Sequence, residues 1–138
     1  MNSGEIWNLM PSDFQSKVKP VRKLTNNVGG DSANKDAAVA TTVDKLFLLS
    51  YSEIVPTSYW AESDPWTSSE GTQYEAFKGN VTNNYSSNDC LVFGGYWWER
   101  SVTPDNSTYF LYVYNNGGPL SNTGAAAGSS CVLPAFSF

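Results

Sequence analysis

The stretch Tyr96-Trp97-Trp98-Glu99-Arg100-Ser101 divides the chain into two parts of different composition. It holds two of the five tryptophans and the only arginine after Arg22. Two large rings beside a guanidinium group are typical of a structural anchor, because the rings favour burial and the guanidinium can hold a neighbouring loop. We therefore interpret this stretch as core and scaffold rather than as a set of direct ligand contacts.

The residues after this stretch carry almost no charge. From Ser101 to Phe138 the one charged residue is Asp105, and Lys, Glu, Gln, Met, His and Trp do not occur. Residues 101–129 are rich in Tyr, Asn, Ser, Gly and Ala. Binding surfaces favour such a composition, since tyrosine gives contact area at low entropy cost and small polar residues adapt to a ligand. Polar loops with a tyrosine-rich exposed strand are the alternative interpretation.

The bulk composition limits the class of protein. A chain of 138 residues predicts a single domain, residues 1–138, that can bury a core without a metal or a disulfide. The net charge of -5 and the lack of a basic stripe argue against nucleic acid and against an anionic membrane surface. No apolar run approaches about 18 residues, so no membrane insertion is expected. No signal peptide is visible, as in a virion component.

The chain contains no histidine, which removes the usual general base and metal ligand. Ser-His-Asp and Cys-His chemistry is therefore excluded within a single chain. The two cysteines, Cys90 and Cys131, do not make a zinc site without histidines, and they fit either one disulfide or two free thiols. We predict that the protein is not an enzyme and has no catalytic residue, metal ligand or cofactor.

Turn and capping signals predict short helices. Ser12 with Gln15, and Ser50 with Glu53, have the spacing of capping boxes, so helices are expected to begin at these serines and to end before Pro20 and Pro56. A further helix of about two turns is expected over residues 70–79, because Gly79 fits a C-cap.

Strands are predicted from alternating or continuous apolar runs at residues 21–25, 43–49, 96–102 and 108–114. Residues 26–38, 56–69, 80–89 and 119–129 are polar or glycine-rich and are predicted loops. Residues 130–138 close the chain, with Pro134 at an edge or bulge. The expected fold class is α+β, with short helices packed on a small, mostly antiparallel twisted sheet and long loops.

Five segments carry a resemblance to a known family. They are residues 44–50, Glu53, residues 70–74 (Glu-Gly-Thr-Gln-Tyr), residues 97–101 (Trp-Trp-Glu-Arg-Ser) and residues 132–136 (Val-Leu-Pro-Ala-Phe). Their order resembles the C-type-lectin-like domains of gut Firmicutes and their phages. Some of those domains resemble variable proteins of diversity-generating retroelements, in which adenine-directed mutagenesis rewrites C-terminal codons. Mutated Asn codons cannot encode Lys, Glu, Gln, Met or Trp, and all five are absent after Arg100.

The resemblance implies a C-type-lectin-like fold and a variable binding segment at about residues 90–130. It implies a scaffold of Trp97, Trp98, Arg100, Val113, Pro134, Ala135 and Phe136. It also implies a ligand-binding face drawn from Phe93, Tyr96, Thr103, Asp105, Asn106, Tyr109, Leu111, Tyr112, Tyr114, Leu120, Asn122 and Ala125. Which side of each strand faces outward depends on the sheet register.

The expected function is therefore a non-enzymatic receptor-binding or display module on a phage tail or a bacterial cell surface. Its partner would be a protein or a glycan receptor on a cell surface. Two alternatives stay open. One is a cysteine-dependent enzyme on a related lectin-like fold, using Cys90 and Cys131. The other is a sugar-binding lectin, for which calcium ligands are scarce because the C-terminal part offers only Asp89 and Asp105.

Overall fold

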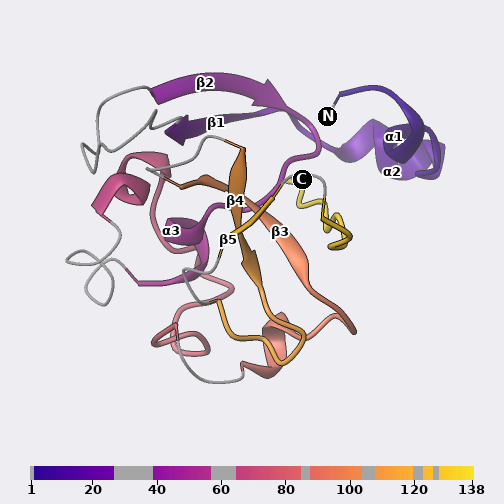
Figure 1. Cartoon of the computed structure of the whole chain (residues 1–138). Helices are drawn as coiled ribbons and strands as arrows, with labels where there is room; N and C mark the ends of the chain where they lie inside the picture. The colour runs from indigo at the N-terminus through magenta and orange to yellow at the C-terminus, as the bar shows by residue number, and fades with distance from the viewer. Residues whose placement is uncertain are drawn as a thin grey trace.

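The computed structural model describes residues 2–26, 39–56, 65–84, 88–103, 108–119, 123–125 and 128–138. These residues form an α+β domain of short helices and small antiparallel sheets, as predicted (Figure 1). The helices are α1 (Glu5–Asn8), α2 (Ser12–Lys17) and α3 (Tyr51–Ile54), with 3-10 helices η1 (Pro65–Glu70) and η2 (Asp89–Leu91). The strands are β1 (Val21–Asn26), β2 (Val39–Asp44), β3 (Trp97–Val102), β4 (Tyr109–Val113) and β5 (Thr123–Ala125). Among the described helices, none has the length and apolar character needed to cross a membrane.

β1 and β2 form a two-stranded antiparallel sheet, in which Val21 lies opposite Asp44. The predicted strand at 43–49 is wrong beyond Asp44, although the burial expected for Leu46 and Phe47 is confirmed. The reason lies in the backbone partners. Phe47 exchanges hydrogen bonds of 2.7 and 3.0 Å with Ala135 of the C-terminal segment, which forms an isolated bridge instead of a ladder.

The two predicted capping boxes have different outcomes. At α3 the prediction is confirmed, because the Glu53 carboxylate accepts the backbone N–H of Ser50 at 3.0 Å. At α2 it is wrong, because Ser12 is the first helical residue and Pro11 occupies the N-cap. Gln15 instead turns its side-chain amide toward α1 and the residues after it, where it donates to backbone carbonyls at 2.8 and 3.0 Å.

The predicted helix at 70–79 is also wrong. Glu70 ends η1, and residues 71–80 form an extended piece followed by turns. Gly71 has a φ of +143°, which no helix contains. The Gln73 amide donates to the carbonyls of Ile54 and Val81 at 2.9 and 2.8 Å, and the Tyr74 N–H donates to Glu53 at 2.9 Å. This segment is therefore held by α3 rather than by hydrogen bonds within a helix.

The second sheet has the order β3-β4-β5 and is antiparallel throughout. Trp97 lies opposite Val113 and Trp98 opposite Tyr112, with a register shift between Trp98 and Val102. The strands expected at 96–102 and 108–114 are confirmed within two residues. β5 lies inside the predicted loop 119–129 and was not predicted. Its sequence, Thr-Gly-Ala, has no alternation of apolar and polar residues that would indicate a strand.

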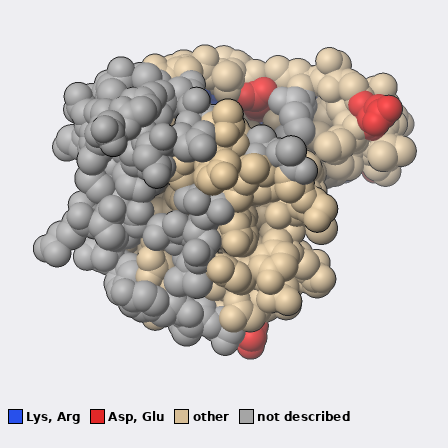
Figure 2. Space-filling model, viewed as in Figure 1, with Lys and Arg blue, Asp and Glu red and all other residues tan. Residues whose placement is uncertain are grey.

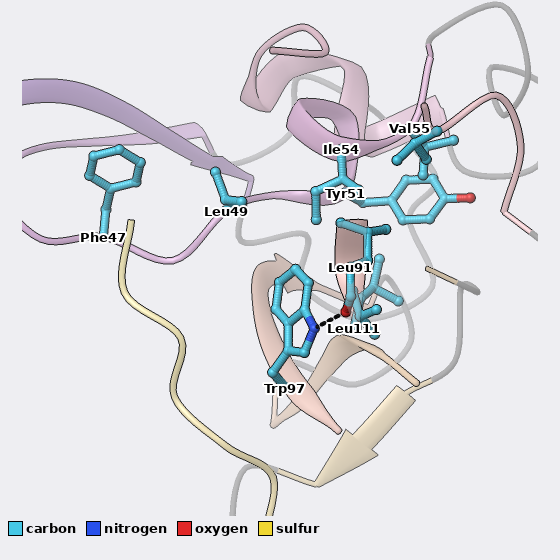
Figure 3. Packing of buried hydrophobic residues seen from close by; sticks show 10 residues of the cluster. Phe47, Leu49, Tyr51, Ile54, Val55, Leu91, Trp97 and Leu111 are labelled. Atoms are coloured by element: carbon cyan, nitrogen blue, oxygen red, sulfur yellow. Dashed lines mark hydrogen bonds between the residues drawn. The ribbon is translucent and has the colours of Figure 1, made fainter. Parts of the chain in front are cut away.

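The main core lies between α3 and the inner face of this sheet (Figure 3). Trp97 is 1% exposed, and its indole N–H donates to the Leu91 carbonyl at 3.1 Å. The remaining core members come from the 47–55 segment, Val81, Leu91 of η2 and the inward residues of β4. The burial predicted for Trp97 is confirmed, and Val113, which the resemblance implies as scaffold, is buried as well.

Candidate functional site

Alternate residues of β3 and β4 point to opposite faces of the sheet, as the pleat of a strand requires. Trp97, Leu111 and Val113 point into the core, whereas Trp98 and Tyr112 stay partly exposed. Tyr96, just before β3, and Tyr114, just after β4, extend the outer row. We call the set Tyr96, Trp98, Tyr112 and Tyr114 the aromatic face.

The rings of the aromatic face contact one another. Tyr112 lies 5.7 Å from Tyr96, 5.9 Å from Trp98 and 5.3 Å from Tyr114, measured between ring centroids. Tyr96 and Tyr114 are 5.4 Å apart. Most pairs meet edge to face, the arrangement that the ring quadrupoles favour. Tyr112 is thus the residue that contacts all three other rings. Burial, together with the hydrogen bond to Tyr114, raises the pKa of the Tyr112 phenol.

A shallow hollow of about 220 Å³ opens beside these rings. Its lining residues are uncharged: Tyr96, Trp98, Tyr112, Gly124, Ala125, Gly128 and Ser130. Figure 2 shows one face of the molecule, on which most of the described surface is uncharged and the acidic side chains form small, separate areas. The chemistry offered by the hollow is therefore apolar ring surface with phenol hydroxyls and exposed backbone.

Small residues fix the position of Trp98. A Cβ atom added to Gly124 would lie 2.9 Å from the Trp98 ring, and one added to Gly128 would lie 3.3 Å from it. The two glycines therefore let the backbone at Gly124 in β5 and at Gly128 pack directly against the indole. Trp98 was predicted as scaffold, and it supports the hollow while also lining it. The glycine spacing that allows this contact carries no sequence signal of its own.

Four of the predicted binding residues belong to this face or line its hollow, and two more are exposed elsewhere. Tyr96, Tyr112 and Tyr114 belong to it, and Ala125 lines its hollow and lies opposite Tyr109 in the sheet. Tyr109 is exposed on the other side of β4 from Tyr112. Phe93 is exposed too, but its ring meets Trp97 at 6.1 Å rather than the aromatic face.

Two predicted binding residues are wrong. Leu111 is 0% exposed because it is an inward residue of β4 and belongs to the core. Thr103 is 3% exposed, and its N–H donates to the Tyr109 carbonyl at 3.0 Å. Asp105, Asn106, Leu120 and Asn122 lie outside the described residues. Of the predicted scaffold, Phe136 is 43% exposed and packs on Phe14 at 4.7 Å rather than in the main core.

A second constellation lies where β3 meets β1, α3 and η1. We call it the buried polar network, and its members are Lys23, Glu53, Glu70, Arg100 and Ser101. Arg100 donates to the Glu53 carboxylate and the Leu24 carbonyl at 3.0 Å each, and to the carbonyls of Leu48 and Glu70. Lys23 forms an ion pair with the same carboxylate. Ser101 donates to the Glu70 carboxylate.

Burial and charge move the pKa values of this network in different directions. Burial raises the pKa of Glu70 to about 7, even though Ser101 and the Asn26 N–H stabilise its charged form. Burial also works against ionised Glu53, but Arg100 and Lys23 outweigh it and hold the pKa of that carboxyl below its ordinary value. Burial lowers the pKa of Lys23. The contacts of these groups hold them in fixed positions, as expected of a scaffold. They also bring together Glu53, Glu70 and Arg100, which belong to three of the sequence segments that carry the resemblance.

The two cysteines do not pair with each other. Cys90 and Cys131 are both exposed free thiols. In the part of the chain that the structure describes, no group of three or more Cys, Asp or Glu side chains is arranged to hold a metal ion. We therefore take the aromatic face, and not the two cysteines, as the candidate functional site.

The chain belongs to the family described as domain of unknown function DUF6273, whose model matches residues 1–138. No curated protein and no solved structure matches the chain.

Proposed function

We propose that this chain is a non-enzymatic ligand-binding module that presents the aromatic face to a protein or glycan receptor. The proposal includes a C-type-lectin-like fold and display on a phage tail or bacterial surface, as the motif resemblance implies. The observation that carries it is the clustering of Tyr96, Trp98, Tyr112 and Tyr114 around an uncharged hollow of about 220 Å³.

The physical argument for the proposal is that the rings of the aromatic face are large and are held in fixed positions. Tyr and Trp are enriched at binding hot spots because they combine large contact area with few rotatable bonds. Here their rings are fixed by mutual packing and by the glycines against Trp98. Such a set loses little conformational entropy when a ligand binds, which favours affinity.

A larger hollow of about 480 Å³ is the competing location. It is lined mainly by scaffold side chains, among them Val21, Phe47, Leu49, Phe77 and Ala135. Several of these residues belong to the core cluster or pack against it. We assign binding to the aromatic face because Tyr112 and Tyr114 belong to the uncharged segment and none of its four rings is part of the main core.

The experiment has two steps. Glycan and surface-protein arrays first identify a ligand for the full chain. Tyr112→Ala and Tyr114→Ala are then titrated against it, with Phe77→Ala at the other hollow as the matched control. Loss of affinity of tenfold or more for the tyrosine variants is expected, as for hot-spot residues. Unchanged affinity of the tyrosine variants, with loss in Phe77→Ala, would transfer the site to the larger hollow.

A further inference from the structure

β2 is the outer strand of its two-stranded sheet. Its residues Val39–Val43 are exposed, with Val43 at 58% and Val39 at 39%. The sequence Val-Ala-Thr-Thr-Val is uncharged and mostly β-branched, the residue types that favour strands. Proteins usually protect such an edge with charges, prolines or bulges, because an unprotected edge pairs with other strands.

Side-chain contacts show which backbone groups of β1 point away from β2. The Leu24 carbonyl accepts from Arg100 at 3.0 Å, and the Asn26 N–H donates to Glu70 at 2.9 Å. Opposite residues of an antiparallel pair either exchange hydrogen bonds with each other or both point outward, in alternation. Leu24 and Asn26, two residues apart, are therefore outward positions.

Their partners in β2 are Thr41 and Val39, so these two also direct their N–H and C=O groups away from β1. A third contact agrees with this alternation of inward and outward positions. The Asn2 amide donates to the Val43 carbonyl at 2.8 Å and accepts the Lys45 N–H at 2.6 Å. Asn2 thus acts like the end of a neighbouring strand beyond Val43, and Val39–Val43 is the stretch of β2 whose outer side pairs with no other described strand.

We propose that this edge pairs with β2 of a second copy of the chain, antiparallel about a twofold axis at Thr41. In this register Val39 lies opposite Val43 of the other copy and Ala40 opposite Thr42, while the two Thr41 residues face each other. The five residues read almost the same in both directions, so valine meets valine and threonine meets threonine. Such cross-strand pairs are favourable, and no like charges meet.

The register also matches the outward hydrogen-bonding groups. Val39, Thr41 and Val43 are outward positions, and each faces an outward position of the second copy. The Val43 carbonyl keeps Asn2, because a carbonyl oxygen has a second lone pair. Pairing converts two marginal two-stranded sheets into one four-stranded sheet. Five residues make a small interface, so the pairing is expected to be weak and to depend on protein concentration.

Sedimentation velocity of the full chain, from about 10 µM to about 1 mM, tests this pairing. The sedimentation coefficient of the wild type should rise with concentration toward that of a dimer. Thr41→Lys and Thr41→Glu should each remain monomeric, because like charges meet on the axis. An equimolar mixture of the two variants should dimerise again, since Lys then faces Glu.

The mixing arm separates pairing from misfolding, and an unchanged thermal midpoint confirms that the exposed substitutions leave the fold intact. Three results would overturn the proposal. One is a wild-type chain that stays monomeric throughout the range. Another is a Thr41→Lys variant that still dimerises. The third is a Lys/Glu mixture that does not recover the dimer.

Discussion

Trp98 and Arg100 are two residues apart in β3, yet they belong to two regions with different physics. Arg100 enters the buried polar network, where its guanidinium contacts one carboxylate and three backbone carbonyls. Trp98 enters the aromatic face, where its neighbours are Tyr112 and the backbone of two glycines. The first region is charged and enclosed, and the second is uncharged and open.

The difference shows how the chain can combine an aromatic face that tolerates substitutions with a buried polar network that does not. A buried charge that loses its partner keeps its desolvation penalty, so the network tolerates few substitutions. A half-exposed ring that is removed costs some contact area and little else. Substitutions in the two regions should therefore differ sharply in their effect on the free energy of unfolding.

The largest effect is expected for Arg100→Ala. It leaves Glu53 with Lys23 alone and removes the donor from the carbonyls of Leu24 and Leu48. Removing one partner of a buried ion pair costs roughly 3–5 kcal/mol. Urea unfolding measures the loss. The chain's other arginine, Arg22, is exposed, and Arg22→Ala should change the free energy of unfolding by about 0.5 kcal/mol or less. Similar losses in both variants would contradict the scaffold role of Arg100.

Neighbouring positions in β4 give the next comparison. Leu111→Ala empties space in the core and should cost about 2–5 kcal/mol of unfolding free energy. Tyr112→Ala removes a partly exposed ring with its ring contacts and should cost less, about 1–2 kcal/mol. The same urea titration serves for both. Equal costs would mean that the outer rings are part of the core, and the proposed binding face would then lose its support.

The same contrast explains what could be predicted from the sequence. The β4 strand and the α3 capping box follow from local patterns, and both are confirmed. The helix expected at 70–79 failed because its signals were local, whereas the contacts of Gln73 and Tyr74 with α3 are long-range. Tertiary partners override weak helix propensity in this way.

The candidate site was predictable in composition but not in register. Tyr112 and Tyr114 stand out in an uncharged, tyrosine-rich segment, and the alternation of a strand makes them share a face. The same alternation places Leu111 in the core, yet which set points inward depends on where Trp97 meets Val113. The packing of Gly124 on Trp98 joins residues far apart in the chain, and a single sequence does not reveal it.

A smaller effect should appear as a dependence of stability on pH. Burial raises the pKa of Glu70 to about 7, above its ordinary value of 4.5. A carboxyl with a raised pKa in the folded state stabilises the fold most below pH 4.5, and that contribution is lost as the pH rises to about 7. The shift corresponds to at most about 3 kcal/mol. The lowered pKa of Glu53 acts below this window.

Urea unfolding at pH 5 and pH 8 measures this dependence. The wild type should be more stable at pH 5. Glu70→Gln keeps the shape of the side chain but cannot ionise, so its two free energies of unfolding should lie closer together. Equal pH dependence in both proteins would assign the titration to another group and would remove Glu70 from the set of enclosed charges.

The last prediction tests whether the packing of Gly124 on Trp98 holds the aromatic face in position. In Gly124→Ala the new methyl group would lie 2.9 Å from the Trp98 ring, so either the ring or β5 must move. Overpacking of this kind costs about 1–3 kcal/mol and should change the near-UV circular dichroism of the indole. Gly95→Ala is the matched control, because its methyl group would meet the Cys131 sulfur at an ordinary 3.6 Å. If Gly124→Ala behaves like Gly95→Ala in both measurements, β5 can shift away from Trp98 with no loss in the free energy of unfolding. The rings would then be free to rearrange on binding, and affinity would have to come from induced fit rather than from a surface fixed in advance.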